Sequence, residues 1–324
     1  MNYFLGLDLG GTTVKGGLLD QDGHIIAKSE IPTGAGRPCG QVAADIAEQG
    51  KKLIDGAGVP ADCVRAAGIC SPGTINTEKG EVVFSGNLGW HCAPISGELE
   101  KCLGIPVFLG NDANVAALGE ARYGSGRNYR DSILITLGTG VGGGIIMGGR
   151  IFEGGRSAGA EIGHMAIVCG GEPCTCGRRG CFEAYASATA LIGQARAAMS
   201  APGGADSLMW KLCGGDPDAV CGKTVTDAVT AGDKTAEQVW DRYLDYLAEG
   251  TANLINIFRP EAVLYGGGVS KAGSLLLDRL VPKFEGLIFG GNDYAHVDFG
   301  IAALGNDAGI CGAAAMAMDH TGVL

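Results

Sequence analysis

Three glycine-rich loops, each placed directly after an apolar run, constrain the fold of this chain more than any other feature. They cover residues 8–13, 137–144 and 265–270. The first two loops each join two apolar runs, which is the pattern of a β-hairpin closed by a glycine turn. Glycine permits such a turn and lets the backbone approach a phosphate closely. Because the two hairpins open stretches of similar pattern, the sequence suggests two related α/β units.

Each loop taken alone has a simpler interpretation. The first is also what a hairpin turn with a capping Asp8 looks like. The second contains G-x-G-x-x-G, but a dinucleotide-binding motif needs a helix directly after it, and residues 145–152 are strand-like. Residues 222–224 (GKT) imitate the end of a P-loop, yet Pro217 stands where the first glycine belongs. Together, and in this order, the three loops resemble the two phosphate loops and the adenosine loop of the sugar kinase, Hsp70 and actin superfamily.

The 324 residues suggest two domains of about 150 residues each. We expect a small N-terminal α/β unit over residues 1–116, completed by a C-terminal helix over 306–324. A larger unit is expected over 117–305, with residues 201–224 as a surface excursion. Other helices are predicted near 40–57 and 94–103, directly after residue 112, and in a long stretch that Pro260 ends.

Composition narrows the classes of partner and compartment. Acidic residues outnumber basic ones by 35 to 24, which argues against nucleic-acid binding. An anionic nucleotide remains compatible with this charge, because glycine loops bind phosphate through backbone N–H groups. No signal peptide or membrane span is visible, so we expect a cytoplasmic protein. In a reducing cytosol three of the 12 cysteines would bind metal and nine would be free thiols.

The segment from Gly159 to Glu183 contains one histidine and three cysteines at short spacing. One imidazole and three thiolates form a ligand set that tetrahedral zinc accepts. The sequence therefore predicts a zinc site, with this set of ligands: His164, Cys174, Cys176 and Cys181. Glu161 and Glu183 flank the ligands, which indicates a metal that shapes a pocket. The alternative is a zinc knuckle remote from any chemistry.

Asn111 and Asp112 join a predicted buried strand to a helix. Either residue is a common helix N-cap at such a position. The other interpretation is that Asp112 faces a cleft and takes the proton from a substrate hydroxyl, which contributes about 10²–10⁴-fold to a rate.

The chain resembles the ROK family (repressors, uncharacterised reading frames and kinases) along nearly its whole length, and most closely the bacterial glucokinases of that family. The resemblance rests on these motifs: DLGGTTVKGGL at 8–18, SPG at 71–73, GNLGW at 86–90, NDANVAALGE at 111–120, LGTGVGGG at 137–144, EIGH at 161–164, CTCGRRGCFE at 174–183 and GGGVS at 266–270. It implies two actin-like (ribonuclease H-like) α/β domains of the hexokinase, Hsp70 and actin superfamily, with the sugar in the cleft. It also implies ATP, Mg²⁺, Zn²⁺ and a homodimer.

The resemblance implies the roles of individual residues. Asp112 is expected as the catalytic base acting on the sugar 6-hydroxyl, and Asp8 as a Mg²⁺ ligand through water. The expected sugar contacts are Asn87, Asn111, Asp112, Glu161, His164 and Glu183. The expected ATP-binding residues are Gly10, Gly11, Thr12, Lys15, Gly138, Thr139, Gly140, Gly266, Gly267 and Gly268. Cys70 departs from the family, which often has Gly or Ala there, and would leave an oxidisable thiol near the sugar.

Three functions remain open at this point. The first is ATP-dependent phosphorylation of glucose to glucose 6-phosphate. The second is a kinase for N-acetylmannosamine, mannose, allose or fructose, with ATP or polyphosphate as donor. The third is a sugar-responsive repressor, which we do not expect because Asp8 leaves no room for a helix-turn-helix domain before it.

Overall fold

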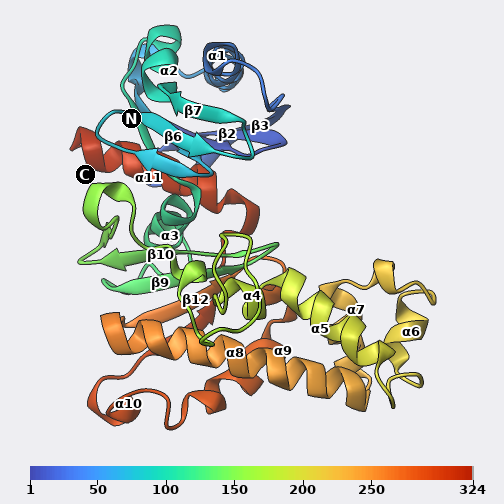
Figure 1. The fold of residues 1–324 in the computed structure, drawn as a ribbon. Helices are drawn as coiled ribbons and strands as arrows, with labels where there is room; N and C mark the ends of the chain where they lie inside the picture. Colours follow the sequence, from blue (N-terminus) through green and yellow to red (C-terminus); the bar gives the residue numbers. More distant parts are fainter. Residues whose placement is uncertain (323–324) are drawn as a thin grey trace. The chain divides into compact units, whose positions relative to one another are not determined.

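The computed structural model describes residues 1–322, apart from the side chains of residues 292 and 293. The chain divides into two compact units. The first consists of Met1–Ser132, Gly144–Ala160 and the residues from Ala303 onward, and the second of Ile133–Gly143 and Glu161–Ala302. This division differs from a boundary at residue 117, because helix α3 (Asp112–Tyr123) passes through that position as one continuous element (Figure 1).

The first unit is built on a five-stranded sheet of the order β3-β2-β1-β4-β8. The strands are β1 (Tyr3–Leu9), β2 (Thr13–Asp20), β3 (Ile25–Pro32), β4 (Val64–Ser71) and β8 (Val107–Asn111). β1 and β2 form the hairpin predicted around the first glycine loop, with Leu9 opposite Val14. β4 and β8 run parallel to β1, so their carboxyl ends lie at the same edge of the sheet.

Alternate side chains of the strands enter two different cores. Leu5, Leu7 and Leu9 pack with helices α1 (Cys39–Gly56) and α2 (Ile95–Leu103). Phe4, on the opposite face, packs with the C-terminal helix α11 (Ala308–Thr321). Successive strand residues point to opposite faces, so this sheet is buried on both sides. The helices predicted near 40–57 and 94–103 and from 306 are confirmed.

Helix α11 lies unusually close to the strands because two of them carry glycine where it crosses. A Cβ atom on Gly6 would lie 1.9 Å from the Ile310 carbonyl oxygen, and one on Gly68 would lie 1.9 Å from that of Ala313. A glycine inside a strand often marks such a close approach of another backbone.

Gly68→Ala is expected to destabilise the first unit by about 3 kcal/mol, because an added methyl group in a closed core forces backbone movement. Gly97→Ala, in helix α2 of the same unit, is the matched control, since no atom lies within 4 Å of its Cβ position. Urea unfolding should show a lower midpoint for Gly68→Ala and an unchanged or higher one for Gly97→Ala. Equal midpoints would contradict the close packing of α11.

A small three-stranded sheet in the first unit was not predicted. It has the order β5-β6-β7 and consists of β5 (Thr74–Asn76), β6 (Glu81–Ser85) and β7 (Trp90–Ala93). These strands are only three to five residues long, which is too short for periodicity to distinguish them from loops. The turn between β6 and β7 carries Asn87.

The second sheet has the order β11-β10-β9-β12-β13. Its strands are β9 (Ser132–Leu137), β10 (Val141–Met147), β11 (Arg150–Ile151), β12 (Ala262–Gly266) and β13 (Asp298–Ile301). The hairpin predicted around the second glycine loop is therefore present as β9 and β10. The third loop directly follows β12, as the sequence indicated.

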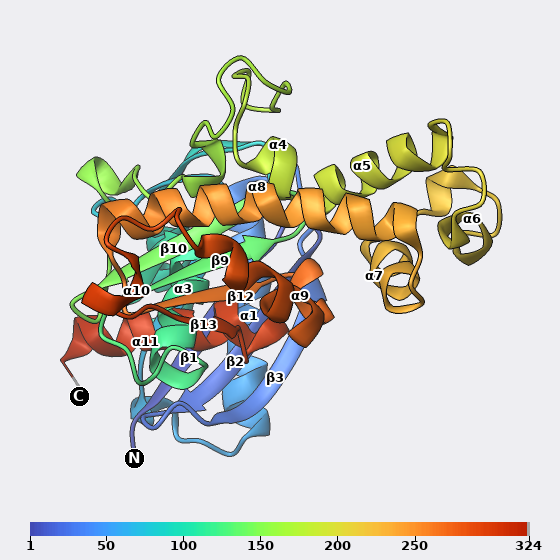
Figure 2. The same cartoon turned by 90° about the horizontal axis from the view of Figure 1, so that it is seen from below.

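The long helix of the second unit is α8 (Lys234–Phe258). It ends at Phe258, and the next residue, Arg259, is left-handed with φ of 44° and directly precedes Pro260. Figure 2 shows the other helices along it, with α5, α6 and α7 gathered near its N-terminal end. These helices are α4 (Glu183–Ala186), α5 (Ala188–Ser200), α6 (Leu208–Leu212), α7 (Gly222–Thr230), α9 (Ser274–Leu280) and α10 (Gly291–Tyr294). The excursion expected over 201–224 thus contains a short helix and the start of another.

Candidate functional site

The four predicted zinc ligands lie together in the second unit. The ligand atoms of His164, Cys174, Cys176 and Cys181 are all within 4.8 Å of one another. Short backbone bonds shape the segment: Cys174 N–H donates to the Arg178 carbonyl at 2.9 Å, and Gly177 N–H to that of Cys174 at 3.0 Å. Phe182 anchors its end, because its ring fills the space beside Gly250 of helix α8.

The spacing of the ligand atoms fits a tetrahedral zinc ion. Zn–S bonds near 2.3 Å and Zn–N bonds near 2.0–2.1 Å place two sulfurs about 3.8 Å apart and a sulfur and a nitrogen about 3.6 Å apart. The Sγ atoms of Cys176 and Cys181 are 3.6 Å apart, and Cys174 Sγ is 3.7 Å from His164 Nδ1. Zinc would be held through Nδ1, which leaves Nε2–H of His164 for another partner.

Glu183 contacts both the second glycine loop and the segment that carries the four predicted ligands, residues 164–181, which we call the zinc segment. Its Oε2 accepts a hydrogen bond from Val141 N–H at 3.1 Å, and its Oε1 accepts one from the Thr175 hydroxyl at 3.2 Å. A Cβ atom on Gly140 would lie 2.2 Å from Oε2. Glycine is therefore required at residue 140 for the carboxylate to lie against the loop. Glu161, the other flanking acid, is exposed and precedes the 3₁₀ helix Ile162–His164.

The second and third glycine loops touch each other. Gly267 has φ of 85°, and a Cβ atom there would lie 2.6 Å from the Leu137 carbonyl oxygen. Residues after Glu183 hold the second loop from its other side: Ala188 N–H donates to the Gly138 carbonyl at 2.8 Å, and the Thr189 hydroxyl to that of Thr139 at 2.7 Å. The backbone of this loop is therefore held in a defined shape.

The first glycine loop lies in the other unit. Gly10 N–H donates to the Thr13 carbonyl at 2.9 Å, which closes the turn. A Cβ atom on Gly11 would lie 3.3 Å from Cβ of Asn87, so the predicted sugar contact Asn87 lies beside this loop. Lys15 is the strand partner of Asp8 on β2, and directly opposed residues point to the same face.

Asp8 lies where the sheet meets the first turn of helix α11. A Cβ atom on Gly309 would lie 2.7 Å from the Asp8 carboxyl carbon. The Cys70 thiol donates to Asp8 Oδ1 at 3.3 Å. A carboxylate is a ligand that Mg²⁺ accepts directly or through water, so the residue type fits the predicted role.

Asn111 and Asp112 have different local roles. Asn111 is the N-cap of helix α3, since its side-chain oxygen accepts from Ala113 N–H at 3.0 Å and Asn114 N–H at 3.2 Å. Its amide donates to the Gly73 carbonyl at 3.3 Å, which ties it to the SPG turn. Asp112 is the first helical residue, and its Oδ1 accepts from Ala113 N–H at 2.9 Å. The sequence allowed either residue to cap the helix, and in the structure the cap is Asn111.

The cysteines outside the zinc segment should differ in reactivity. Burial and the Asp8 carboxylate raise the pKa of Cys70 well above that of an ordinary thiol, and the side chain is fully buried. A hydrogen bond with the Thr224 hydroxyl lowers the pKa of the exposed Cys221. Because thiolates are the reactive form, iodoacetamide at pH 8 should label Cys221 in the folded protein and spare Cys70 until unfolding. Peptide mass mapping measures the labelling. If Cys70 were labelled as fast as Cys221, burial would not protect the Cys70 thiol, and the oxidation expected from the sequence would be possible.

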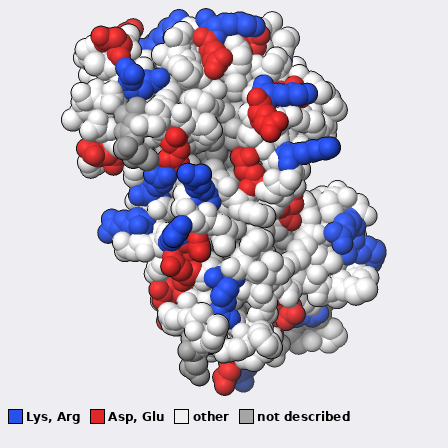
Figure 3. Space-filling model, turned by 90° about the vertical axis from the view of Figure 1, so that its left-hand side faces the viewer, with Lys and Arg blue, Asp and Glu red and all other residues white. Residues whose placement is uncertain are grey.

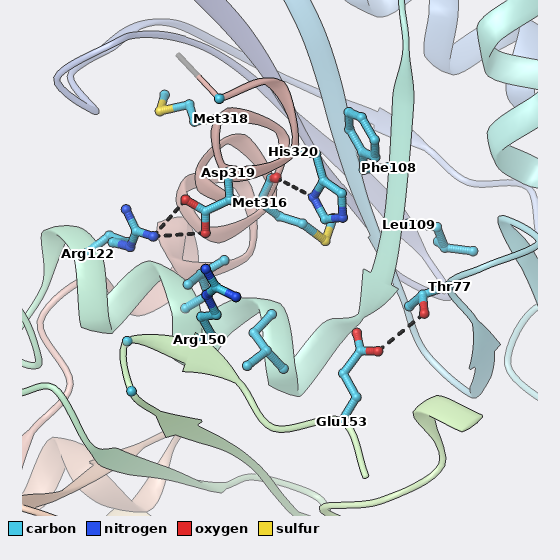
Figure 4. A pocket seen from close by; sticks show the side chains of 15 residues that line it. Thr77, Phe108, Leu109, Arg122, Arg150, Glu153, Met316, Met318, Asp319 and His320 are labelled. Atoms are coloured by element: carbon cyan, nitrogen blue, oxygen red, sulfur yellow. Dashed lines mark hydrogen bonds and ion pairs between the residues drawn. The ribbon is translucent and has the colours of Figure 1, made fainter. Parts of the chain in front are cut away.

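A cavity of about 810 Å³ lies in the first unit, between β8, α3, α11 and the β10–β11 turn (Figure 4). Arg122 and Asp319 form an ion pair at its border, at 2.6 Å. The Thr77 hydroxyl donates to Glu153 at 3.2 Å on another side. None of the described residues that line it belongs to the predicted sugar, nucleotide or metal sets.

On the face drawn in Figure 3, Lys and Arg side chains are interspersed with Asp and Glu and form no continuous basic stripe. Within residues 1–322, every helix is too short or too polar to cross a bilayer.

Three residues that support these sites, or helix α3 that carries Asp112, were not predicted from the sequence. Thr175 supports Glu183, Gly309 makes room for Asp8, and the buried Glu120 accepts N–H bonds from Ser125, Ala303 and Leu304. Only Thr175 carried a signal, because it stands between two predicted ligands. The other two depend on contacts between distant parts of the chain.

Comparison with known proteins identifies relatives over almost the whole chain. The model of the ROK family matches residues 4–320. Glucokinase of Thermotoga maritima is 39% identical over 98% of both chains, and glucokinase of Streptomyces coelicolor is 36% identical over 98% of both. The crystal structure of a ROK family glucokinase from Streptomyces griseus in complex with glucose and AMPPNP is 35% identical, with a TM-score of 0.79, over 98% of this chain and 100% of that one. The predicted α/β fold class is thereby confirmed.

Proposed function

This chain belongs to the ROK family, and from that premise we propose that it is a glucokinase, which transfers the γ-phosphoryl group of ATP to the 6-hydroxyl of glucose. The observation that carries the proposal is the similarity to glucokinases along nearly the full length of both chains. The zinc ligand set and the shaped glycine loops support it, because they supply the residue types that a hexose and a triphosphate need.

Glucose presents hydroxyl groups, each of which donates and accepts a hydrogen bond. Carboxylates and amides are therefore the side chains that recognise it. We assign this role to Asn87, Asn111 and Asp112 of the first unit and to Glu161, His164 and Glu183 of the second. When bound, zinc fixes the tautomer and orientation of the His164 ring, so that Nε2–H can donate to a sugar oxygen.

Asp112 acts as the general base. Its carboxylate takes the proton of the 6-hydroxyl, the sugar oxygen forms a bond to the γ-phosphorus, and the bond to the β-phosphate bridging oxygen breaks. The products are glucose 6-phosphate and ADP, and the proton leaves Asp112 for solvent. Helix α3 holds the base at its first residue, where Asn111 has already satisfied the cap.

ATP is bound by backbone groups of the three loops, with Lys15 adding a positive charge near the phosphates. The residues assigned to it are Gly10, Gly11, Thr12, Lys15, Gly138, Thr139, Gly140, Gly266, Gly267 and Gly268. Asp8 would hold Mg²⁺ through water, and the metal supplies neutralisation of phosphate charge when bound. Removing Mg²⁺ with chelator should therefore abolish turnover.

A substrate panel tests the proposal. With ATP in excess, kcat/KM should be highest for glucose among glucose, mannose, N-acetylmannosamine, allose and fructose. The product is identified by coupling to glucose-6-phosphate dehydrogenase, and polyphosphate is offered as an alternative donor. A higher kcat/KM for N-acetylmannosamine would reassign the substrate, and turnover of none of the sugars would refute the kinase.

A homodimer, which the family resemblance implies, is tested by light scattering.

A further inference from the structure

We propose that Glu183 is a positioning residue that couples the zinc segment to the second glycine loop, so that zinc binding strengthens the binding of the nucleotide as well as that of the sugar. The inference rests on the proposed function, which assigns nucleotide phosphates to this loop. It adds a regulatory link between two ligands whose binding residues are otherwise separate.

The first contact of Glu183 is with the loop itself. Val141 N–H donates to Oε2 at 3.1 Å, and the absence of a side chain at Gly140 lets the carboxylate lie against the backbone. The neighbouring carbonyl groups of Gly138 and Thr139 are held by Ala188 and Thr189. Glu183 thus completes the support of residues 138–141, and it does so at the side from which β10 leaves.

The second contact is with the zinc segment. The Thr175 hydroxyl donates to Oε1 at 3.2 Å, and the Cys174 thiol lies 3.5 Å from the same oxygen. As a zinc ligand Cys174 is a thiolate and cannot donate, so Thr175 is the donor that remains. Thr175 stands between two ligands, and Glu183 follows Cys181 by two residues. Binding of the metal therefore fixes both the donor and the acceptor of this bond.

The two contacts use different oxygens of one carboxylate. An ionised carboxylate offers about four lone-pair sites, so both bonds can persist while a sugar hydroxyl is accepted. Order in the zinc segment is then transmitted to the loop through a single rigid group. Because coupling between binding equilibria is reciprocal, the protein should in turn bind zinc more tightly when a nucleotide occupies the loop.

The coupling is tested by equilibrium binding of AMPPNP to the zinc-loaded protein without sugar, measured by isothermal titration calorimetry. Loss of a charge-assisted hydrogen bond predicts about tenfold weaker binding for Glu183→Gln and about threefold weaker for Thr175→Val. Thr175 belongs to none of the proposed sugar, nucleotide or metal sets. Thr230→Val, at the exposed end of helix α7, is the matched control and should bind as the wild type.

Two further readouts do not depend on activity. Hydrogen exchange of the Val141 amide should accelerate in Glu183→Gln and after zinc removal, whereas amides of β1 and β2 stay protected. AMPPNP should also slow the transfer of zinc to a chelator. If AMPPNP affinity and Val141 exchange are unchanged in both variants while glucose binding weakens, Glu183 serves the sugar alone and the coupling is refuted. If the coupling is measured but no sugar is phosphorylated, the proposed function fails and the coupling stands.

Discussion

Asp112→Asn should lower kcat for glucose phosphorylation by about 10²–10⁴-fold, the usual contribution of a positioned general base. The amide has no carboxylate to take the proton, but it keeps an oxygen that can accept from Ala113 N–H as Oδ1 does. Helix α3 should still start normally, because Asn111 supplies the cap. The measurement is ADP formation in a coupled assay at saturating glucose and ATP.

The control for this variant is Asp62→Asn, which removes an exposed carboxylate in the 3₁₀ helix Ala61–Cys63 of the same unit. It should keep wild-type turnover. Zinc content, the unfolding midpoint and glucose affinity of Asp112→Asn should stay near those of the wild type. Near wild-type turnover would remove Asp112 from the role of base, and a lowered unfolding midpoint would assign the residue a structural role.

Loss of zinc should have the second large effect. Cys181→Ser removes a fully buried ligand, and perturbing a metal site even beyond its direct ligands costs about 10–100-fold in affinity or activity. We expect turnover to fall by at least about 100-fold, with less than one zinc per chain by metal analysis. The reason is that His164 and Glu183 are oriented by the same segment.

Cys169→Ser provides the matched control, because Cys169 is exposed, lies in the same segment and is not a member of the ligand cluster. This variant should keep both zinc and activity. Amide hydrogen exchange should be faster in residues 165–182 of Cys181→Ser than in the wild type, while amides of the first sheet remain protected. Full activity in a protein without zinc would contradict the assigned role of the metal.

The elements that depend on residues close together in the chain could be predicted from the sequence. Glycine turns between apolar runs predicted the hairpins of β1 with β2 and of β9 with β10. A long helical stretch that Pro260 ends was predicted, and helix α8 confirms it. The strands β5 to β7 escaped prediction because each is only a few residues long, and their order depends on pairing between them.

The cluster of one histidine and three cysteines could be predicted almost completely from the sequence, because its members fall between residues 164 and 181 and short turns can bring them together. The position of Asn111 and Asp112 between a predicted buried strand and a helix also placed this pair at a helix start. Which of the two caps the helix was decided by side-chain geometry, since either residue type can cap.

By itself, the sequence determined the local features: the glycine turns, the cluster of one histidine and three cysteines, and the acids beside it, all of which depend on neighbours along the chain. The tertiary structure alone decided which backbone covers Gly6 and Gly68, that Asp8 meets the start of α11, and that Glu183 rests on Gly140. A residue pattern reports which face of an element is buried. It does not report which distant segment covers that face, because that choice is made by packing between elements far apart in the chain.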